Sequence, residues 1–338
     1  MTLRIGLVGA GLAAHSHALD IVTNPEMELV GVTSGGIKSA EALADTFGGT
    51  VYADLATLLA VARLDALVVA VPHRLTLDIA EQVPPRLACL TEKPIATTRA
   101  DIRRLAALEK SRSRMFAPFN RRYQPHARWL ADALSHEAIG TLDRVDANWS
   151  GPFGARYAES AQTFRSTASR REGVLVDNAS HALDLIAMVV PRSVSAGLDH
   201  PTEMKSIVEF NPRGAEIKAD LAFRVGQVAV DLKVSDQADH PDCGSWRVEF
   251  HGDRGTASID ETSAILQSPN GEPISELAGE MARPVADLIR LVEGRPPWGA
   301  SLASAVAVSK VVVAAHDAAT PPWKRPRGKA LGRLNGSC

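Results

Sequence analysis

Two kinds of segment alternate regularly over roughly the first third of the chain. Short, nearly continuous apolar runs are typical of strands buried on both faces of a sheet, and the segments between them repeat apolar residues at helical spacing. This order predicts an α/β fold with a doubly wound parallel sheet, which we place at residues 1–118. The strand runs are Leu3–Val8, Glu28–Thr33, Ala66–Val71 and Leu87–Thr91, and the helical segments are Ala13–Val22, Ile37–Phe47, Leu75–Val83 and Thr98–Ser111.

Residues 119–338 follow a different pattern, which predicts a second α/β domain. Apolar residues from Val228 to Val234 alternate with more polar ones, as in a strand with one buried face. Such a sheet packs one face on helices and leaves an apolar face to be covered, so we expect a homodimer or homotetramer through it. Pro284 is predicted to open a long closing helix at about 281–318, which returns toward the first domain. Further strands are expected at Ser206–Phe210, Ile217–Phe223 and Trp246–His251.

Charge and cysteine content narrow the class of protein. The formal net charge is −2 at pH 7, which gives no reason to expect nucleic acid or an anionic membrane as partner. Cys89, Cys243 and Cys338 form no Cys-x-x-Cys pair, a pattern that argues against a disulfide scaffold and fits a reducing compartment. The longest Ala/Val-rich stretch, residues 303–319, is interrupted by polar residues and is not expected to span a bilayer. We therefore expect a cytoplasmic protein with a small-molecule ligand.

A glycine-rich turn follows the first predicted strand. Residues Gly9-Ala10-Gly11-Leu12-Ala13-Ala14 match the dinucleotide fingerprint G-x-G-x-x-G/A. Gly9 permits the tight turn, Gly11 lets the backbone approach a pyrophosphate, and Ala14 lets the helix pack on the strand. The helix N-terminus then stabilises the anion. The position of this turn between a strand and a helix predicts a Rossmann domain that binds a dinucleotide through Gly9, Gly11, Leu12, Ala13 and Ala14.

The end of the second predicted strand bears on which dinucleotide binds. A carboxylate there would accept a hydrogen bond from the ribose 2′-hydroxyl of NAD and repel a 2′-phosphate. This chain has Ser34 and Gly35 instead, with Lys38 just beyond. A hydroxyl, free backbone N–H groups and a nearby cation suit a phosphate better, so we expect NADP, with NAD as the alternative.

Asp177 and His181 form the second candidate for chemistry. In an α-helix residues four apart share a face, so the carboxylate is predicted to orient the imidazole and raise its basicity for proton transfer. From the residues alone, two alternatives remain: His181 is a core histidine, or Asp177, His181 and Asp184 bind a metal such as Zn²⁺.

Three segments together, in this order, resemble the glucose–fructose oxidoreductase and inositol dehydrogenase family (Gfo/Idh/MocA). They are the Gly9 turn followed by His17, Glu92-Lys93-Pro94, and Asp177-x-x-x-His181. The resemblance covers nearly the whole chain and includes the junction Phe119–Tyr123. It implies an N-terminal Rossmann domain and a C-terminal α/β domain with a large, mostly antiparallel open sheet. The Ser34-Gly35 turn resembles the family's NADP-binding members.

The resemblance also implies roles for individual residues. Lys93, Asp177 and His181 become the catalytic set, with a cis bond between Lys93 and Pro94 and no metal. The same three residues, with Asn120, Arg121 and Tyr123, are expected to contact substrate. Val71, Pro72, His73, Glu92 and Lys93 join the cofactor site, although Glu92 could instead pair with Lys93. Two departures from the family pattern stand out: His73 occupies the place of the usual Asn, and Ala179 that of a Gly.

These features predict an oxidoreductase that transfers a hydride between NADP and a secondary alcohol or ketone of a sugar, cyclitol or related polyol. His181 is the expected base, with Lys93, Tyr123 or Tyr157 as alternatives. Two other interpretations are kept: a biosynthetic keto-sugar or imine reductase of the same fold, and a non-catalytic NADP-binding regulatory protein.

Overall fold

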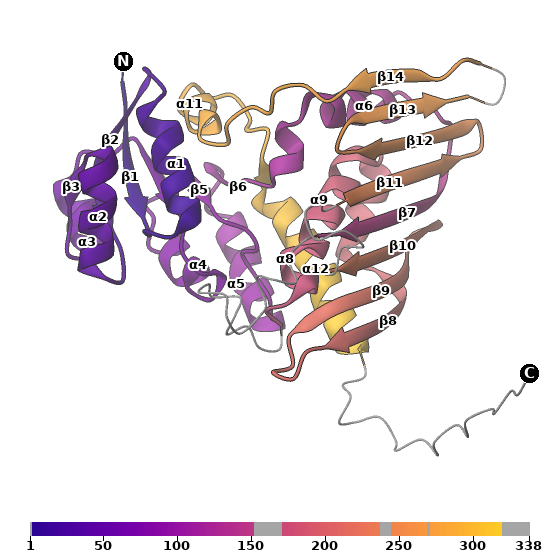
Figure 1. Cartoon of the computed structure of the whole chain (residues 1–338), viewed down its shortest axis with the longest axis horizontal. Helices are drawn as coiled ribbons and strands as arrows, with labels where there is room; N and C mark the ends of the chain where they lie inside the picture. Colours follow the sequence, from indigo (N-terminus) through magenta and orange to yellow (C-terminus); the bar gives the residue numbers. More distant parts are fainter. Residues whose placement is uncertain (1, 152–170, 237–244, 269–270, 320–338) are drawn as a thin grey trace, which may run out of the picture.

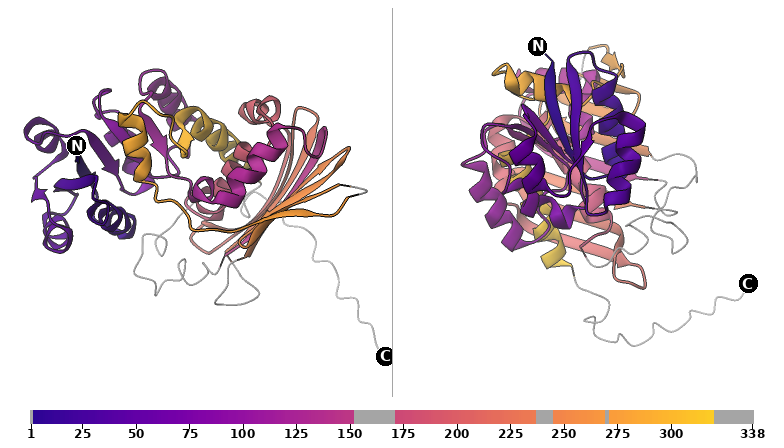
Figure 2. Two further views of the ribbon diagram at one scale, coloured as in Figure 1. Left: turned by 90° about the horizontal axis from the view of Figure 1, so that it is seen from above. Right: turned by 90° about the vertical axis from the view of Figure 1, so that its left-hand side faces the viewer.

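Two β-sheets with helices between them make up the protein (Figure 1). The structure is a computed structural model that describes residues 2–151, 171–236, 245–268 and 271–319. Seen from above, the seven-stranded sheet and the eight-stranded sheet lie at opposite ends, and a layer of helices separates them (Figure 2).

The first sheet has the order β15-β6-β5-β4-β1-β2-β3. Its strands β1 to β6 are parallel, and the crossover helices between them cover its faces, as in a doubly wound domain. The predicted fold is therefore confirmed. The strands are β1 (Leu3–Val8), β2 (Met27–Thr33), β3 (Thr50–Val51), β4 (Ala66–Val69), β5 (Ala88–Thr91), β6 (Met115–Ala117) and the antiparallel β15 (Ala300–Ser301). The helices are α1 (Leu12–Val22), α2 (Ile37–Phe47), α3 (Leu55–Val61), α4 (His73–Ala80) and α5 (Arg99–Glu109).

The second sheet has the order β14-β13-β12-β11-β7-β10-β9-β8 and is antiparallel except for the β7–β10 pair. Helices α6, α8 and α9 pack against its inner face. The strands are β7 (Leu142–Ser150), β8 (Thr202–Phe210), β9 (Glu216–Val225), β10 (Val228–Ser235), β11 (Ser245–Gly252), β12 (Gly255–Asp260), β13 (Ser263–Gln267) and β14 (Ile274–Leu277). The remaining helices of this part are η1 (Asn120–Tyr123), α6 (Pro125–Ser135), α8 (Val174–Asp177), α9 (Ala179–Val189), α10 (Arg192–Ser195) and η3 (Ala196–Asp199).

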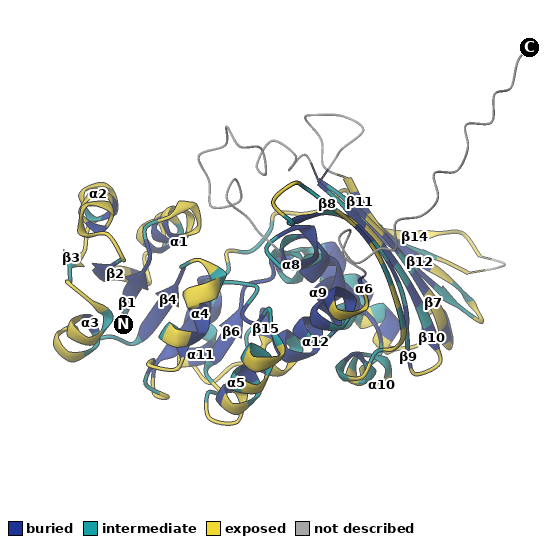
Figure 3. Ribbon diagram, turned by 90° about the horizontal axis from the view of Figure 1, so that it is seen from below, coloured by how far each residue is buried: buried dark blue, intermediate teal, exposed yellow. Residues whose placement is uncertain are grey.

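The outer face of this sheet is mostly polar, although the edge strands carry exposed apolar residues such as Ile207 on β8. Buried and more exposed residues alternate along its strands (Figure 3), and charged side chains occupy the outward positions. Arg144 pairs with Asp146 at 2.7 Å, and His251 Nε2 lies 3.0 Å from the same carboxylate. The expectation of an open apolar face is therefore wrong. Assembly through this sheet stays a prediction, but burial of an apolar face no longer supports it.

The closing segment is two helices instead of the single helix expected at about 281–318. α11 (Ala286–Val292) ends before Gly294, whose φ of +77° stops the helix, and Pro296 and Pro297 follow. The chain then adds β15 to the first sheet and continues as α12 (Leu302–Ala318), which is buried around most of its circumference between the two sheets. Of the helices in the described ranges, none combines the length and apolar character that crossing a membrane requires.

Candidate active site

The Gly9 turn lies at the carboxyl end of β1, where strand order reverses between β1 and β4. Gly9 has φ +117°, and a Cβ on it would stand 2.1 Å from the carbonyl oxygen of Ala70. Only glycine permits this close approach of the two loops. Ligands of open α/β sheets bind at this reversal point.

The N-terminus of α1 begins at this turn. Gly11 is its N-cap residue and supplies no side-chain cap, and a Cβ on Gly11 would have no atom within 4 Å. Leu12 is 85% exposed, Ala13 is exposed, and Ala14 is fully buried against the sheet. The helix therefore presents uncapped N–H groups to open space, as an anion-binding helix does.

The turn after β2 is held by Ser34. Its hydroxyl donates to the carbonyl oxygen of Gly36 at 2.7 Å. Gly35 and Lys38 are exposed, and α2 has neither a side-chain cap nor an acidic residue in its first turn. This turn lies beside the Gly9 turn, since the Gly9 N–H donates to the carbonyl oxygen of Thr33.

The loop after β4 brings a histidine to the same edge. Val71 is half-buried, Pro72 is the N-cap residue of α4, and His73 is its first residue. His73 Nε2 lies 3.8 Å from Glu172 Oε1 of the second domain. Burial lowers the pKa of His73, and the nearby carboxylates of Glu172 and Asp177 partly oppose that shift.

Glu92, after β5, pairs with His17. Its Oε1 lies 2.8 Å from His17 Nε2, and His17 is only 5% exposed on α1. Its Oε2 accepts the backbone N–H of Lys93 at 3.2 Å. The alternative in which Glu92 pairs with the Lys93 ammonium is wrong, because that ammonium points to the second domain. The cofactor contact predicted for Glu92 stays a prediction.

Lys93 connects the two domains. The bond between Lys93 and Pro94 is cis, as the family resemblance implied. The Lys93 ammonium donates to Asp177 Oδ1 at 3.1 Å and to the Asp177 carbonyl oxygen at 3.3 Å. Both side chains are largely buried, at 13% and 14% exposure. Tertiary folding thus pairs two predicted catalytic residues that lie 84 positions apart.

Asp177 and His181 lie on two helices instead of the one expected. α8 ends at Asp177 and α9 starts at Ala179, with Asn178 between them. The Asp177 carbonyl accepts from the Ser180 hydroxyl and from Lys93, whereas the His181 N–H donates to the carbonyl of Asn178. The helix is interrupted here because the Lys93 ammonium and the Ser180 hydroxyl take the place of the His181 N–H, which would donate to the Asp177 carbonyl in a continuous helix. The orienting role of Asp177 toward the imidazole stays a prediction.

Aromatic rings surround His181. Its imidazole meets the ring of Phe119 edge-on at 5.8 Å and lies parallel to Trp149 at 6.3 Å. Trp149 in turn stacks on Trp246 of the neighbouring strand at 5.0 Å. Sequence analysis did not single out these tryptophans. The two tryptophans occupy inward positions on β7 and β11. The sequence could have shown this only if the two strands had first been paired in the correct register.

The polar residues at the domain junction, Asn120 to Tyr123, have different environments. Tyr123 is fully buried, its hydroxyl donates to Asp287 Oδ2 at 2.7 Å, and burial raises its pKa well above the usual value. Its predicted roles as a substrate contact or alternative base are therefore wrong. Asn120 and Arg121 are half-buried on η1, which packs against α9. Tyr157 lies outside the described residues.

Asp184 has a structural partner. Its carboxylate is fully buried and accepts three hydrogen bonds of 2.8–3.0 Å from Arg122. It therefore does not lie on a helix surface, and its oxygens are not directed to a metal shared with Asp177 and His181. Across the described ranges, no group of three or more His, Cys, Asp or Glu residues is placed to hold a metal ion.

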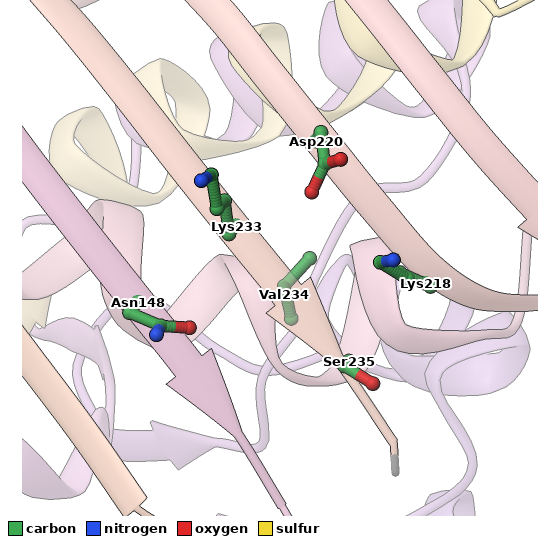
Figure 4. Close-up of a pocket in the computed structure, with 6 residues that line it drawn as sticks. All are labelled: Asn148, Lys218, Asp220, Lys233, Val234 and Ser235. Atoms are coloured by element: carbon green, nitrogen blue, oxygen red, sulfur yellow. The ribbon is translucent and has the colours of Figure 1, made fainter.

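A shallow pocket of about 220 Å³ lies away from these residues, on the second sheet (Figure 4). It contains none of the predicted site residues and no histidine. Its lining is Asn148, Lys218, Asp220, Lys233, Val234 and Ser235. The candidate active site is therefore the edge of the first sheet that faces α8 and α9, where Lys93 meets Asp177.

Two solved structures have the same fold as this chain. GenD2 from gentamicin A biosynthesis, in complex with NAD, superposes with a TM-score of 0.73 and 21% identity, covering 94% of each chain. KijD10, a 3-ketoreductase from Actinomadura kijaniata in complex with NADP and TDP-benzene, superposes with a TM-score of 0.71 and 18% identity, covering 94% of this chain and 98% of that one.

Sequence relatives identify the family. An inositol 2-dehydrogenase of Rhizobium meliloti (strain 1021) is 31% identical over 147 residues, covering 43% of this chain and 44% of that protein, less than half its length. Inositol 2-dehydrogenase 1 of Saccharopolyspora erythraea is 32% identical over 277 residues, covering 80% of this chain and 78% of that protein. Residues 3–119 match the oxidoreductase family with an NAD-binding Rossmann fold, and residues 127–258 match the Gfo/Idh/MocA C-terminal domain. The chain therefore belongs to the Gfo/Idh/MocA family of oxidoreductases.

Proposed function

We propose that this protein is an NADP-dependent oxidoreductase that transfers a hydride between nicotinamide and a secondary alcohol or ketone of a sugar or cyclitol. The observation that carries the proposal is the pair between Lys93 and Asp177, at the sheet edge that also holds the Gly9 turn. The names of its relatives, inositol 2-dehydrogenases among them, support this substrate class.

The residues of the first domain fit a dinucleotide. The uncapped N-terminus of α1 and the open space at Gly11 suit a pyrophosphate. Ser34 and Lys38 follow β2, the strand whose carboxyl end contacts the adenosine ribose in Rossmann domains, which supports their proposed role. When bound, the nicotinamide cofactor supplies the hydride acceptor or donor. Every proton transfer then depends on side chains of this chain.

Lys93 and His181 divide those tasks. In oxidation, the Lys93 ammonium donates a hydrogen bond to the substrate oxygen and stabilises the charge that develops there. Asp177 holds that ammonium in place at 3.1 Å. His181 accepts the hydroxyl proton, and in reduction it returns a proton to the same oxygen. The stacked Trp149 and the edge of Phe119 keep its ring in a defined plane.

The proposed base is tested by His181→Ala. Turnover of the true substrate should fall by about 10²–10⁴-fold while NADP(H) still binds, because a positioned acid–base group contributes that much. Steady-state rates and cofactor fluorescence measure the two effects. His200→Ala, at an exposed histidine of the second domain, is the matched control. Near wild-type turnover in the His181 variant would show that another group is the base.

The proposed cofactor is tested by titration. NADP(H) should bind more tightly than NAD(H), because no carboxylate occupies the turn at Ser34 and Lys38 lies beside it. Ser34→Asp should weaken NADP binding about tenfold or more by placing a negative charge against the 2′-phosphate. Ser135→Asp, an exposed position on α6, makes the same change in charge away from the site and should have no effect. An equal affinity of the wild type for both cofactors would reject the preference.

A further inference from the structure

Two adjacent arginines on η1 have opposite surroundings. Arg122 forms a bidentate pair with the buried carboxylate of Asp184 at 2.8–3.0 Å. Arg121 makes no hydrogen bond or ion pair with any residue in the described part of the chain, and its Nε is buried there without an acceptor. Among the described residues, Arg122 thus has a paired carboxylate, whereas the carboxylate that acts on Arg121, that of Glu261, forms no ion pair with it.

Arg121 is held by aromatic rings. Its guanidinium carbon lies 4.7 Å from the ring centre of Trp246 and 5.3 Å from that of Trp149, and both rings are only 4% exposed. Burial lowers the pKa of Arg121, and the more distant carboxylate of Glu261 partly opposes that shift. Stacking fixes the plane of a guanidinium but satisfies none of its N–H donors, which lie in that plane. Its donors therefore remain available to a ligand.

The position of Arg121 places those donors at the candidate site. Trp149, under the guanidinium, is the ring that lies parallel to His181, and Phe119, two residues before Arg121, meets the same imidazole edge-on. Two further polar atoms near this junction, Asn120 Oδ1 and Asn178 Nδ2, are buried with no hydrogen-bond partner among the described residues. A ligand that extends from Lys93 to His181 therefore lies close to Arg121, Asn120 and Asn178, which offer hydrogen-bonding groups with no partner among the described residues.

We propose that Arg121 is a specificity-determining residue that binds an anionic group of the substrate. The preferred substrates are then sugars or cyclitols that carry a carboxylate or a phosphate in addition to the reacting hydroxyl. A planar guanidinium pairs with either group through two parallel hydrogen bonds, and a neutral hydroxyl cannot replace both. This inference rests on the proposed function, since it assumes that the substrate oxygen lies between Lys93 and His181.

The test compares three probes that differ in charge: D-glucose, D-glucose 6-phosphate and D-glucuronate. Their affinities for the NADP-loaded protein are measured by calorimetry, and their turnover by cofactor absorbance. At least one anionic probe should bind about 10–100-fold more tightly than D-glucose, because hydrogen bonds to a charged group in a partly buried site are strong. The probe that shows this gain tells whether phosphate or carboxylate is the group recognised.

Arg121→Met removes the donors and keeps an unbranched side chain over the tryptophans. The gain in affinity of the anionic probe over D-glucose should disappear, because the two parallel hydrogen bonds to the anionic group can no longer form. Arg121→Lys keeps the charge but loses the paired donors, so it should retain only part of the gain. Arg128→Met is the matched control, because Arg128 stacks on Trp298 at 4.0 Å and has no part in the proposed site.

Two outcomes would overturn the inference: no anionic probe binds more tightly than D-glucose, or Arg121→Met weakens all three probes equally. The second outcome would show that Arg121 only packs against the tryptophans. An absence of turnover for every probe, with the gain in affinity intact, would count against the proposed function and leave the assignment of Arg121 supported.

Discussion

Replacing Lys93 with methionine is expected to lower turnover by about 10²–10⁴-fold while NADP(H) binding persists. Methionine has a similar length but no ammonium, so the substrate oxygen loses its charged donor. The change also leaves Asp177, which is 14% exposed, without the ammonium that lies 3.1 Å from its carboxylate. Turnover is measured at saturating cofactor, and cofactor affinity is measured separately by fluorescence titration.

Lys110→Met is the matched control for this prediction, because Lys110 is exposed at the C-terminal end of α5 and is not one of the candidate site residues. It should retain wild-type turnover. A Lys93→Met protein that is folded, binds NADP(H) and turns over at the wild-type rate would contradict the assignment. A parallel loss of cofactor binding would instead mean that Lys93 acts mainly in holding the cofactor.

Removing the Arg122 side chain is expected to give the largest loss of stability. Arg122→Met leaves the fully buried carboxylate of Asp184 without its three hydrogen bonds, and breaking a buried pair from one side costs about 3–5 kcal/mol of the free energy of unfolding. Urea denaturation measures the change. Arg192→Met, at an exposed arginine of α10, should change stability by less than about 0.5 kcal/mol.

The pH dependence gives this prediction a second measurement. Burial raises the pKa of Asp184, and Arg122 opposes that shift, so the pKa should rise further in Arg122→Met. A carboxyl whose pKa is higher in the folded state than in the unfolded state binds more protons when folded, so stability falls as pH rises between the two values. The loss of unfolding free energy caused by Arg122→Met should therefore be smaller at about pH 5 than at about pH 8.

A double variant separates burial from pairing. Arg122→Met with Asp184→Leu replaces both charges by apolar groups and should recover most of the lost stability, because neither charge then remains buried alone. If the single variant costs less than about 1 kcal/mol, water or another donor must satisfy Asp184, contrary to the observed geometry.

Local patterns predicted the first domain well because each signal depends on neighbours in the chain. The runs that became β1, β2, β4 and β5 are apolar along their length because both faces of that sheet are covered. Short elements such as β3, with two residues, have no period to detect. The strands β7 and β12–β14 were missed for a related reason: their mixed polar and apolar residues become interpretable only once paired with neighbours.

The sequence by itself determined the doubly wound sheet and the Gly9 turn, because backbone sterics and periodicity act between residues a few positions apart. It also supplied Lys93 and His181 as candidate catalytic residues. Only the tertiary structure decided which partner each charged group received. It paired Lys93 with Asp177, interrupted the helix at Asn178, and gave Arg122 a carboxylate while Arg121 received two tryptophans. The two arginines are adjacent and chemically identical in the sequence. Their difference arises because Asp184 and the tryptophan pair reach η1 from elements that are distant along the chain.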